Sequence, residues 1–239
     1  DKMVTIDLSG IASSYGMSCA TGITPDGEYV VGWYWEYDES SYYSQQYGMV
    51  IPFCYDVIKN KVTVPEVGNR LYNDVAATAI KAVAPDRTLL GYEQTYNSLL
   101  SLVWTDEYTP FEYVHFEYDS AYNPVYGLGD TQNLFSQTGR YIYGKAVDYT
   151  NSQEIAAAFD RETQSLMTFA GGSVTAMSDN GVAFINDVPY YLGTTSYVVD
   201  VTKGEPYEWT ELEEWLFDEH DVDIASFLPT TDTDSEDGL

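Results

Sequence analysis

The chain has 239 residues, and its 38 acidic and 10 basic side chains give a formal net charge of −28. Such an acidic surface repels phosphate backbones and anionic lipids, which excludes ordinary nucleic-acid binding and electrostatic attachment to membranes. Hydrophobic residues make up 44% of the chain, enough for a globular core. No apolar run approaches the roughly 18 residues that cross a bilayer, so we expect no membrane insertion.

The start of the chain, DKMVTIDLSG, lacks the basic and apolar segments of a secretory signal. A cytoplasmic protein and an exported protein whose signal has been removed both fit this start. The two cysteines, Cys19 and Cys54, are too few for a disulfide framework, and no glycine motif for phosphates or dinucleotides occurs. We therefore expect no cofactor.

The first clear element is a short hairpin that recurs along the chain. Its copies are CATGITPDGEYVVG (19–32), IKAVAPDRTLLG (80–91), NLFSQTGRYIYG (133–144) and the degenerate VTAMSDNGVAF (174–184). Aligning Asp26, Asp86, Thr138 and Asn180 gives spacings of 60, 52 and 42 residues. In each copy a turn rich in Pro, Asp, Asn or Gly separates two apolar runs, which is typical of paired antiparallel strands.

A second strand–turn–strand pattern follows each copy, at 53–64, 102–114, 158–169 and 199–209. Two hairpins make a four-stranded antiparallel unit of about 40–60 residues, the size of a propeller blade. The sequence therefore predicts an all-β, propeller-like array of about four such blades in residues 1–204, with units near 17–67, 76–116, 131–170 and 172–209. An ordinary β-sandwich is the alternative.

The units share a frame of small, apolar and turn residues, clearest at Ala20, Ile23, Thr24, Asp26, Gly27 and Gly32 and in the strand Val103-Trp104-Thr105. This frame resembles the HAF-type repeat of bacterial extracellular proteins. The stretch 212–227 also resembles the segment that precedes a further repeat in those proteins. The resemblance covers about residues 17–228, although units two to four each lack part of the frame. It implies a propeller-like fold in a secreted or cell-surface protein, often one without an assigned activity.

Closure of the propeller is an open question at this stage. A closed ring commonly completes its last blade with a strand from the other terminus, and four blades are at the low end of the known range. Residues 2–8 alternate well enough to be that closing strand. Alternatively, the chain is part of a larger propeller, or a partner completes it.

Two long connections, 37–47 and 117–133, are rich in tyrosine. In antiparallel blades they should lie on one face, from which the acidic C-terminal segment also leaves. Tyrosine offers a large amphipathic contact area, so we predict that a protein or glycan partner binds this acidic, tyrosine-rich face. The candidate binding residues there are Tyr37, Tyr42, Tyr43, Tyr118 and Tyr122. Packing over the blade ends is the alternative.

The run GWYWEY at 32–37 is a second binding candidate. Strand alternation places Trp33, Trp35 and Tyr37 on one side, where they could stack against sugar rings. The alternative, which we favour, is that Trp33 and Trp35 fill the space between adjacent blades.

Residues 205–239 contain 13 acidic residues and no Lys or Arg, so the other 204 residues carry a charge of −15. We expect a helix over 210–219, with Thr210 and Glu213 at capping-box spacing and a stripe of Leu212, Trp215 and Leu216 packed on the blades. A flexible acidic tail should follow.

Three acidic residues in this tail alternate like the start of a calcium loop: Asp232, Asp234 and Glu236. Asp237, however, stands where such a loop needs Gly, and the later Glu is missing. An acidic linker without metal is therefore favoured over a weak calcium site.

Catalytic patterns are sparse. His115 and His220 are the only histidines, which excludes a multi-histidine metal site, and neither lies in a nucleophile motif. The first strands of the four units carry no carboxylates, which argues against a glycoside hydrolase with acids in a propeller funnel. Cys19 and Cys54 should lie two strands apart, about 9–10 Å, and remain free, buried thiols.

We therefore expect a non-catalytic secreted or cell-surface module that binds or scaffolds a protein or glycan. A carbohydrate-active enzyme with carboxylates in a propeller funnel is the alternative.

Overall fold

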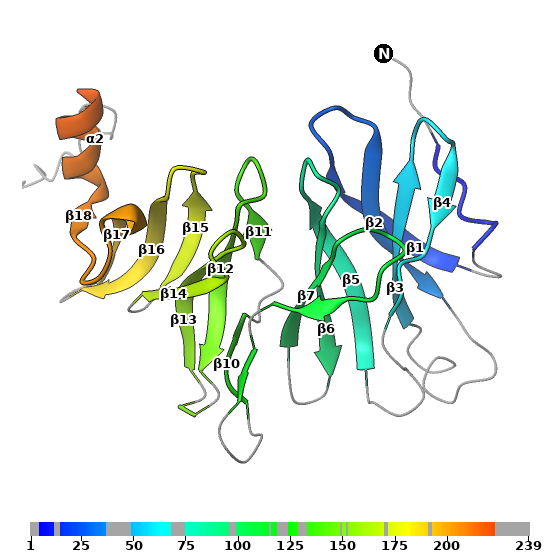
Figure 1. Ribbon diagram of the computed structural model, residues 1–239, viewed down its shortest axis with the longest axis horizontal. Helices are drawn as coiled ribbons and strands as arrows, with labels where there is room; N and C mark the ends of the chain where they lie inside the picture. The colour runs from blue at the N-terminus through cyan, green and yellow to red at the C-terminus, as the bar shows by residue number, and fades with distance from the viewer. Residues whose placement is uncertain are drawn as a thin grey trace, which may run out of the picture.

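The computed structural model describes residues 5–11, 15–36, 49–67, 75–95, 99–114, 116–118, 124–128, 133–148, 150–151, 153–169, 172–190 and 193–222. This part of the chain is mostly β-strand, with a 3-10 helix, η1 (Val201–Lys203), and an α-helix, α2 (Leu212–His220), near its end. Figure 1 shows four sheet units side by side, with α2 beside the last of them.

Each unit contains four consecutive strands that pair antiparallel. The strands are β1 (Tyr15–Ile23), β2 (Tyr29–Glu36), β3 (Met49–Asp56) and β4 (Lys61–Thr63); β5 (Val75–Val83), β6 (Leu89–Thr95), β7 (Leu99–Trp104) and β8 (Glu112–Tyr113); β11 (Leu134–Phe135), β12 (Tyr141–Asp148), β13 (Gln153–Asp160) and β14 (Ser165–Phe169); and β15 (Ser173–Met177), β16 (Val182–Tyr190), β17 (Gly193–Asp200) and β18 (Trp209–Glu211). A single parallel bridge, Val50 to Ala77, joins the first two units into one larger sheet. The predicted propeller-like array of four antiparallel units is confirmed.

The first turn of every unit has the same backbone geometry. One residue in each turn has a positive φ: Gly27 (74°), Arg87 (67°), Gly139 (83°) and Gly181 (88°). Its amide donates to the carbonyl three residues earlier, at 2.8 to 3.1 Å. These residues directly follow the four that the sequence alignment matched, so the repeat is a structural one. Arg87 occupies a conformation that favours glycine, the residue found at the other three positions.

Adjacent units pack face to face through apolar clusters. The alternation of side chains along a strand lets one central strand serve two interfaces. On β6, Leu89 packs with Tyr29 and Trp104 between the first and second units, whereas Leu90 packs with Ile142 and Phe159 towards the third. A third cluster joins the third and fourth units; its buried residues are Tyr141, Ala156, Ala158, Met167, Phe169, Val174, Met177, Ala183, Ile185 and Val199.

Polar contacts between turns also link each unit to the next. The Arg87 guanidinium lies 3.6 Å from Glu28 and 3.7 Å from Asp56 of the first unit. Arg161 of the third unit donates to Thr88 Oγ1 of the second at 2.8 Å. At the last interface the amide and hydroxyl of Thr138 donate to Asp179 Oδ1 at 3.0 and 2.8 Å. We call these three contacts the inter-unit clasps.

The array is open in the described part of the chain, because the first and fourth units lie at opposite ends (Figure 1). Residues 5–11 cover the outer face of the first unit, where Leu8 is buried against Tyr34, Ile51 and Phe53. The expectation that residues 2–8 complete the last blade is therefore wrong for residues 5–8. Their apolar side chains instead pack on the unit that follows them in the chain.

The connection predicted at 117–133 contains regular structure. β9 (Phe116–Tyr118) and β10 (Pro124–Leu128) pair with each other, and β10 pairs with β12. The reason is that β11 is only two residues long and covers only Tyr143 and Ile142 of β12. β10 pairs with the rest of this edge of β12, at Ala146, Val147 and Asp148.

The predicted strand order around the cysteines is correct, since β2 lies between Cys19 on β1 and Cys54 on β3. Both thiols are free, but only Cys54 is buried; Cys19 is exposed, contrary to expectation. Burial raises the pKa of the Cys54 thiol to about 12, which makes it a poor nucleophile.

Candidate functional site

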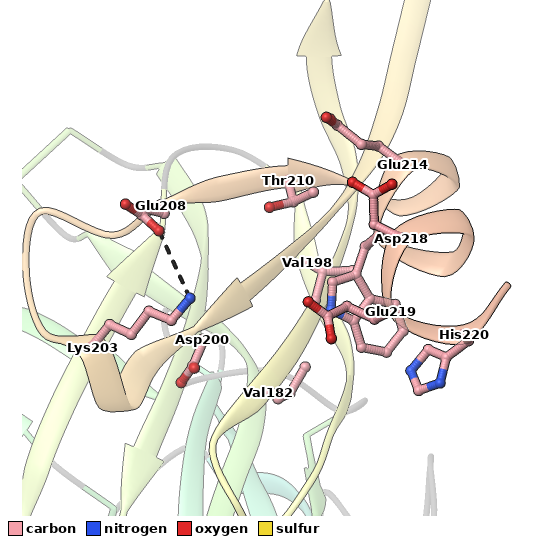
Figure 2. A pocket seen from close by; sticks show the side chains of 11 residues that line it. Val182, Val198, Asp200, Lys203, Glu208, Thr210, Glu214, Asp218, Glu219 and His220 are labelled. Carbon is pink, nitrogen blue, oxygen red and sulfur yellow. Dashed lines mark ion pairs between the residues drawn. The ribbon is translucent and has the colours of Figure 1, made fainter.

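A groove opens between the outer face of the fourth unit and helix α2. Its volume is about 480 Å³. The lining residues come from β16, β17, β18, the β17–β18 connection and α2: Val182, Val198, Asp200, Lys203, Glu208, Thr210, Glu214, Trp215, Asp218, Glu219 and His220. In Figure 2, Glu214, Asp218 and Glu219 project from the helix, while Lys203 and Glu208 form the opposite wall.

Strand alternation supplies the apolar floor of the groove. On β16, Ala183 and Ile185 belong to the cluster shared with the third unit. Val182 and Phe184 therefore point to the other side, which no further unit covers in the described chain. The Trp215 ring meets Phe184 edge-on, with ring centroids 5.5 Å apart. This contact holds α2 against the sheet.

Helix α2 begins two residues later than predicted. Thr210 lies in β18, and the N-cap residue Glu211 makes no side-chain capping hydrogen bond, so the predicted capping box is wrong. The predicted stripe of Leu212, Trp215 and Leu216 does face the protein, but all three remain half-buried. Helix α2 thus packs against the side of the fourth unit, where Trp215 of this stripe contacts Phe184 of the sheet.

The groove is strongly negative. Five of its lining residues are carboxylates, against one lysine and one histidine. Lys203 Nζ lies 3.8 Å from Glu208 Oε2, and Asp200 Oδ1 accepts hydrogen bonds from the Thr202 amide and hydroxyl. Glu214, Asp218 and Glu219 are exposed and form no ion pair with a described residue.

The polar lining consists mainly of carboxylates. It contains no serine or cysteine, and its histidine, His220, is exposed and lies edge-on to Trp215 with ring centroids 4.5 Å apart. Across the described residues, no group of three or more His, Cys, Asp or Glu side chains is arranged to hold a metal ion. What the groove offers is negative charge beside an aromatic and aliphatic surface.

The sequence-predicted binding residues lie elsewhere. Trp33 and Trp35 are half-buried on β2, on the same side as Tyr29 and Val31, which pack against the second unit. That position agrees with the alternative of filling space between blades. Tyr118 ends β9, and its side chain is outside the described part.

The remaining predicted residues fall outside the described ranges: Tyr37, Tyr42, Tyr43, Tyr122, the calcium candidates Asp232, Asp234 and Glu236, and His115. Sequence reasoning had placed Trp215 on the blades but missed the groove beside it. The signal available was the helix itself, in which four carboxylates surround a single tryptophan.

Comparison with known proteins defines the class of fold. No protein-family model matches the sequence, and the search of curated proteins found no match. Among solved structures, an oligogalacturonate lyase in complex with manganese matches with 11% identity and a TM-score of 0.53. Prolyl oligopeptidase B from Galerina marginata matches with 12% identity and a TM-score of 0.53.

These matches span 83% and 86% of this chain but only 52% and 30% of the two neighbours, so the chain covers about half the length of the lyase. Both neighbours are β-propeller enzymes, and the chain has a β-propeller-like fold. At this identity the likeness concerns the fold alone. In the described ranges, neither helix has the length and apolar character needed to cross a membrane.

Proposed function

We propose that this chain is a non-catalytic, propeller-like module of a secreted or cell-surface bacterial protein, and that it binds or scaffolds a protein or glycan. The observation that carries this proposal is the groove between the fourth unit and α2. It combines an open concave surface, an aromatic ring and unpaired charge, the features of recognition sites. The resemblance to HAF-type repeats supports the extracellular location.

A catalytic role has less support. The first strands of the units, β1, β5, β11 and β15, contain no Asp or Glu. In the first two units these strands are close neighbours, since Thr21 Oγ1 donates to the Ile80 carbonyl at 2.7 Å. A glycoside hydrolase needs a facing pair of carboxylates, for which these strands supply no side chain.

The open array supports a second part of the proposal, that a longer chain or a partner completes the propeller. The tyrosine-rich connections remain proposed partner-binding segments on the face opposite the first-hairpin turns. Together with the groove they would give the module two recognition surfaces.

The test is a binding screen of the full chain against basic, acidic and neutral peptides and oligosaccharides, read by calorimetry and by mass spectrometry of the ligand. We expect saturable binding of at least one class, with the ligand recovered intact. Cleavage of an oligosaccharide that is lost on removal of a single carboxylate would overturn the non-catalytic assignment.

A further inference from the structure

We infer that the groove beside α2 binds a cationic segment of another protein, an extended peptide that carries two or more Lys or Arg side chains. This inference rests on the proposed binding function and names the partner class. Glu214, Asp218 and Glu219 supply the negative charge (Figure 2), and Trp215 with Val182 supplies the apolar surface.

The groove has an excess of negative charge that the described chain does not neutralise. Lys203 is the only Lys or Arg in the lining, and Glu208 already faces it. Elsewhere the molecule pairs its cations closely, as Arg140 does with Asp160 at 2.9 Å and Lys145 with Glu154 at 2.8 Å. The three helix carboxylates must therefore take their counter-charge from solvent or from a partner.

A cationic partner would further stabilise helix α2. Glu214 and Asp218 are four residues apart on α2, and like charges at this spacing repel each other along one face of a helix. No residue of α2 is buried, its N-cap makes no side-chain hydrogen bond, and nine residues are too few for an independently stable helix. A cation placed between the two carboxylates would replace this repulsion with attraction.

The chemistry of the walls favours lysine or arginine side chains over other cations. A bare metal ion would need several carboxylates converging on one point, and the described residues contain no such group. Lys and Arg have long aliphatic stems that can lie along Val182, and their charged ends can also contact the face of Trp215. A volume of about 480 Å³ accommodates several such side chains.

Long-range electrostatics also favour a basic partner. With a net charge of −28, the molecule attracts basic partners and repels acidic ones before contact. A neutral glycan would gain nothing from this field. Among the partner classes considered, a basic polypeptide is the one that uses both the charge and the apolar wall.

The experiment titrates the full chain with a nine-residue peptide that alternates lysine and leucine, and with matched peptides carrying glutamine or glutamate in place of lysine. Binding is measured by calorimetry at moderate ionic strength. We expect the lysine peptide to bind, and the double variant D218N/E219Q to weaken its affinity at least tenfold. The matched control is E66Q/E112Q, which removes two exposed carboxylates far from the groove and should leave the affinity unchanged.

Charge reversal gives an independent readout. The variant D218K/E219K should lose the lysine peptide and gain the glutamate peptide, with an unchanged circular dichroism spectrum in the β region. Equal weakening by the groove and control variants would overturn the inference, because binding would then follow net charge alone. Binding of a neutral glycan or of calcium, but of no basic peptide, would also overturn it while leaving the proposed binding function in place.

Discussion

Two buried threonines of the second unit differ in their hydrogen bonding. Thr78 Oγ1 has no hydrogen-bond partner among the described residues, whereas Thr88 Oγ1 accepts from Arg161 at 2.8 Å. An unsatisfied buried hydroxyl costs about 1–3 kcal/mol, so T78V should raise the free energy of unfolding by about 1 kcal/mol. T88V should lower it by a similar amount, because it removes an acceptor from Arg161. Urea unfolding of the two variants checks this, and a loss of stability in T78V would contradict it.

Glu93 is a buried carboxyl, 4% exposed, and desolvation raises its pKa above the ordinary value. The folded state therefore holds this proton when the unfolded chain has already lost it. The stability that the protonated group confers is present below the ordinary Glu pKa and is lost as the pH rises through the raised value.

The variant E93Q removes this titration. Its free energy of unfolding, relative to wild type, should therefore increase as the pH rises from the ordinary Glu pKa through the raised pKa of Glu93. The control E112Q, at an exposed position on β8, should show no such trend. A difference between E93Q and wild type that is independent of pH would contradict the prediction.

For single residues, the sequence predicts which positions form turns better than it predicts whether a side chain is buried or exposed. The turn residues were aligned correctly because their backbone conformation depends on local chemistry, down to the positive φ shared by Gly27 and Arg87. The exposure of Cys19 was missed because burial depends on which neighbour covers a strand. Similarly, nothing in the local sequence of Glu93 reveals that this carboxyl is buried.

Among the elements, β12 is notable for having two short partners in place of one first strand. The gap between β10 and β11 is filled by a side chain: Asn133 Oδ1 accepts from the Lys145 amide at 2.9 Å, and Asn133 Nδ2 donates to the Lys145 carbonyl at 3.3 Å. The same amide group donates to Ser101 Oγ of the second unit at 3.0 Å. The Asn133 side chain thus forms the hydrogen bonds to β12 that a neighbouring strand would form, and it also links the second and third units.

N133A should therefore destabilise the fold by about 1–3 kcal/mol, because it removes both hydrogen bonds to the Lys145 backbone and the one to Ser101. The control N151A removes an amide that bonds Asp148 in an exposed turn, and should cost less than about 0.5 kcal/mol. Thermal unfolding of both variants provides the measurement. Equal effects would mean that β12 is held by its other neighbour, β13, alone.

The split strand also shows where element prediction fails. The hairpins were recognisable because their turns and alternation are local signals. The β9–β10 hairpin was read as a connection because its pairing with β12 depends on the shortness of β11, a non-local condition. Helix α2 was found from its apolar stripe, but its start was misplaced because Thr210 pairs with Val198 in the sheet.

In the whole molecule, the open array explains why closure could not be predicted. The alternating sequence of residues 2–8 fits two roles equally well: a strand that closes the last unit, or a segment whose apolar side chains cover the first unit. Only the three-dimensional position of the chain distinguishes the two roles. The groove escaped prediction for the same reason, since it exists only where α2 folds back on a sheet face that lacks a neighbouring unit.

At the scale of the whole molecule, repulsion among the acidic residues destabilises the fold, whereas the inter-unit clasps stabilise it. The clasps include ion pairs near the surface, each worth about 0–1 kcal/mol and weakened by salt. The surplus of 28 negative charges repels itself throughout the fold, and salt weakens that repulsion as well. The sign of the salt effect therefore reports which contribution is larger.

Two of the clasps involve ion pairs: Arg87 pairs with Glu28 and Asp56, and Arg161 also lies 3.4 Å from Asp86 of the second unit. We expect repulsion to dominate, because these few ion pairs face an excess of 28 acidic charges spread over the chain. The melting temperature should therefore rise as sodium chloride increases from about 20 to 300 mM, a range over which the Debye length falls from roughly 20 to 6 Å. Potassium chloride should act equally, with a chelator present to exclude a divalent-ion effect. A melting temperature that falls with salt would instead mean that the clasps hold the units together against a weaker repulsion. In that case R161M, which removes one of the two ionic clasps, should reduce the salt dependence.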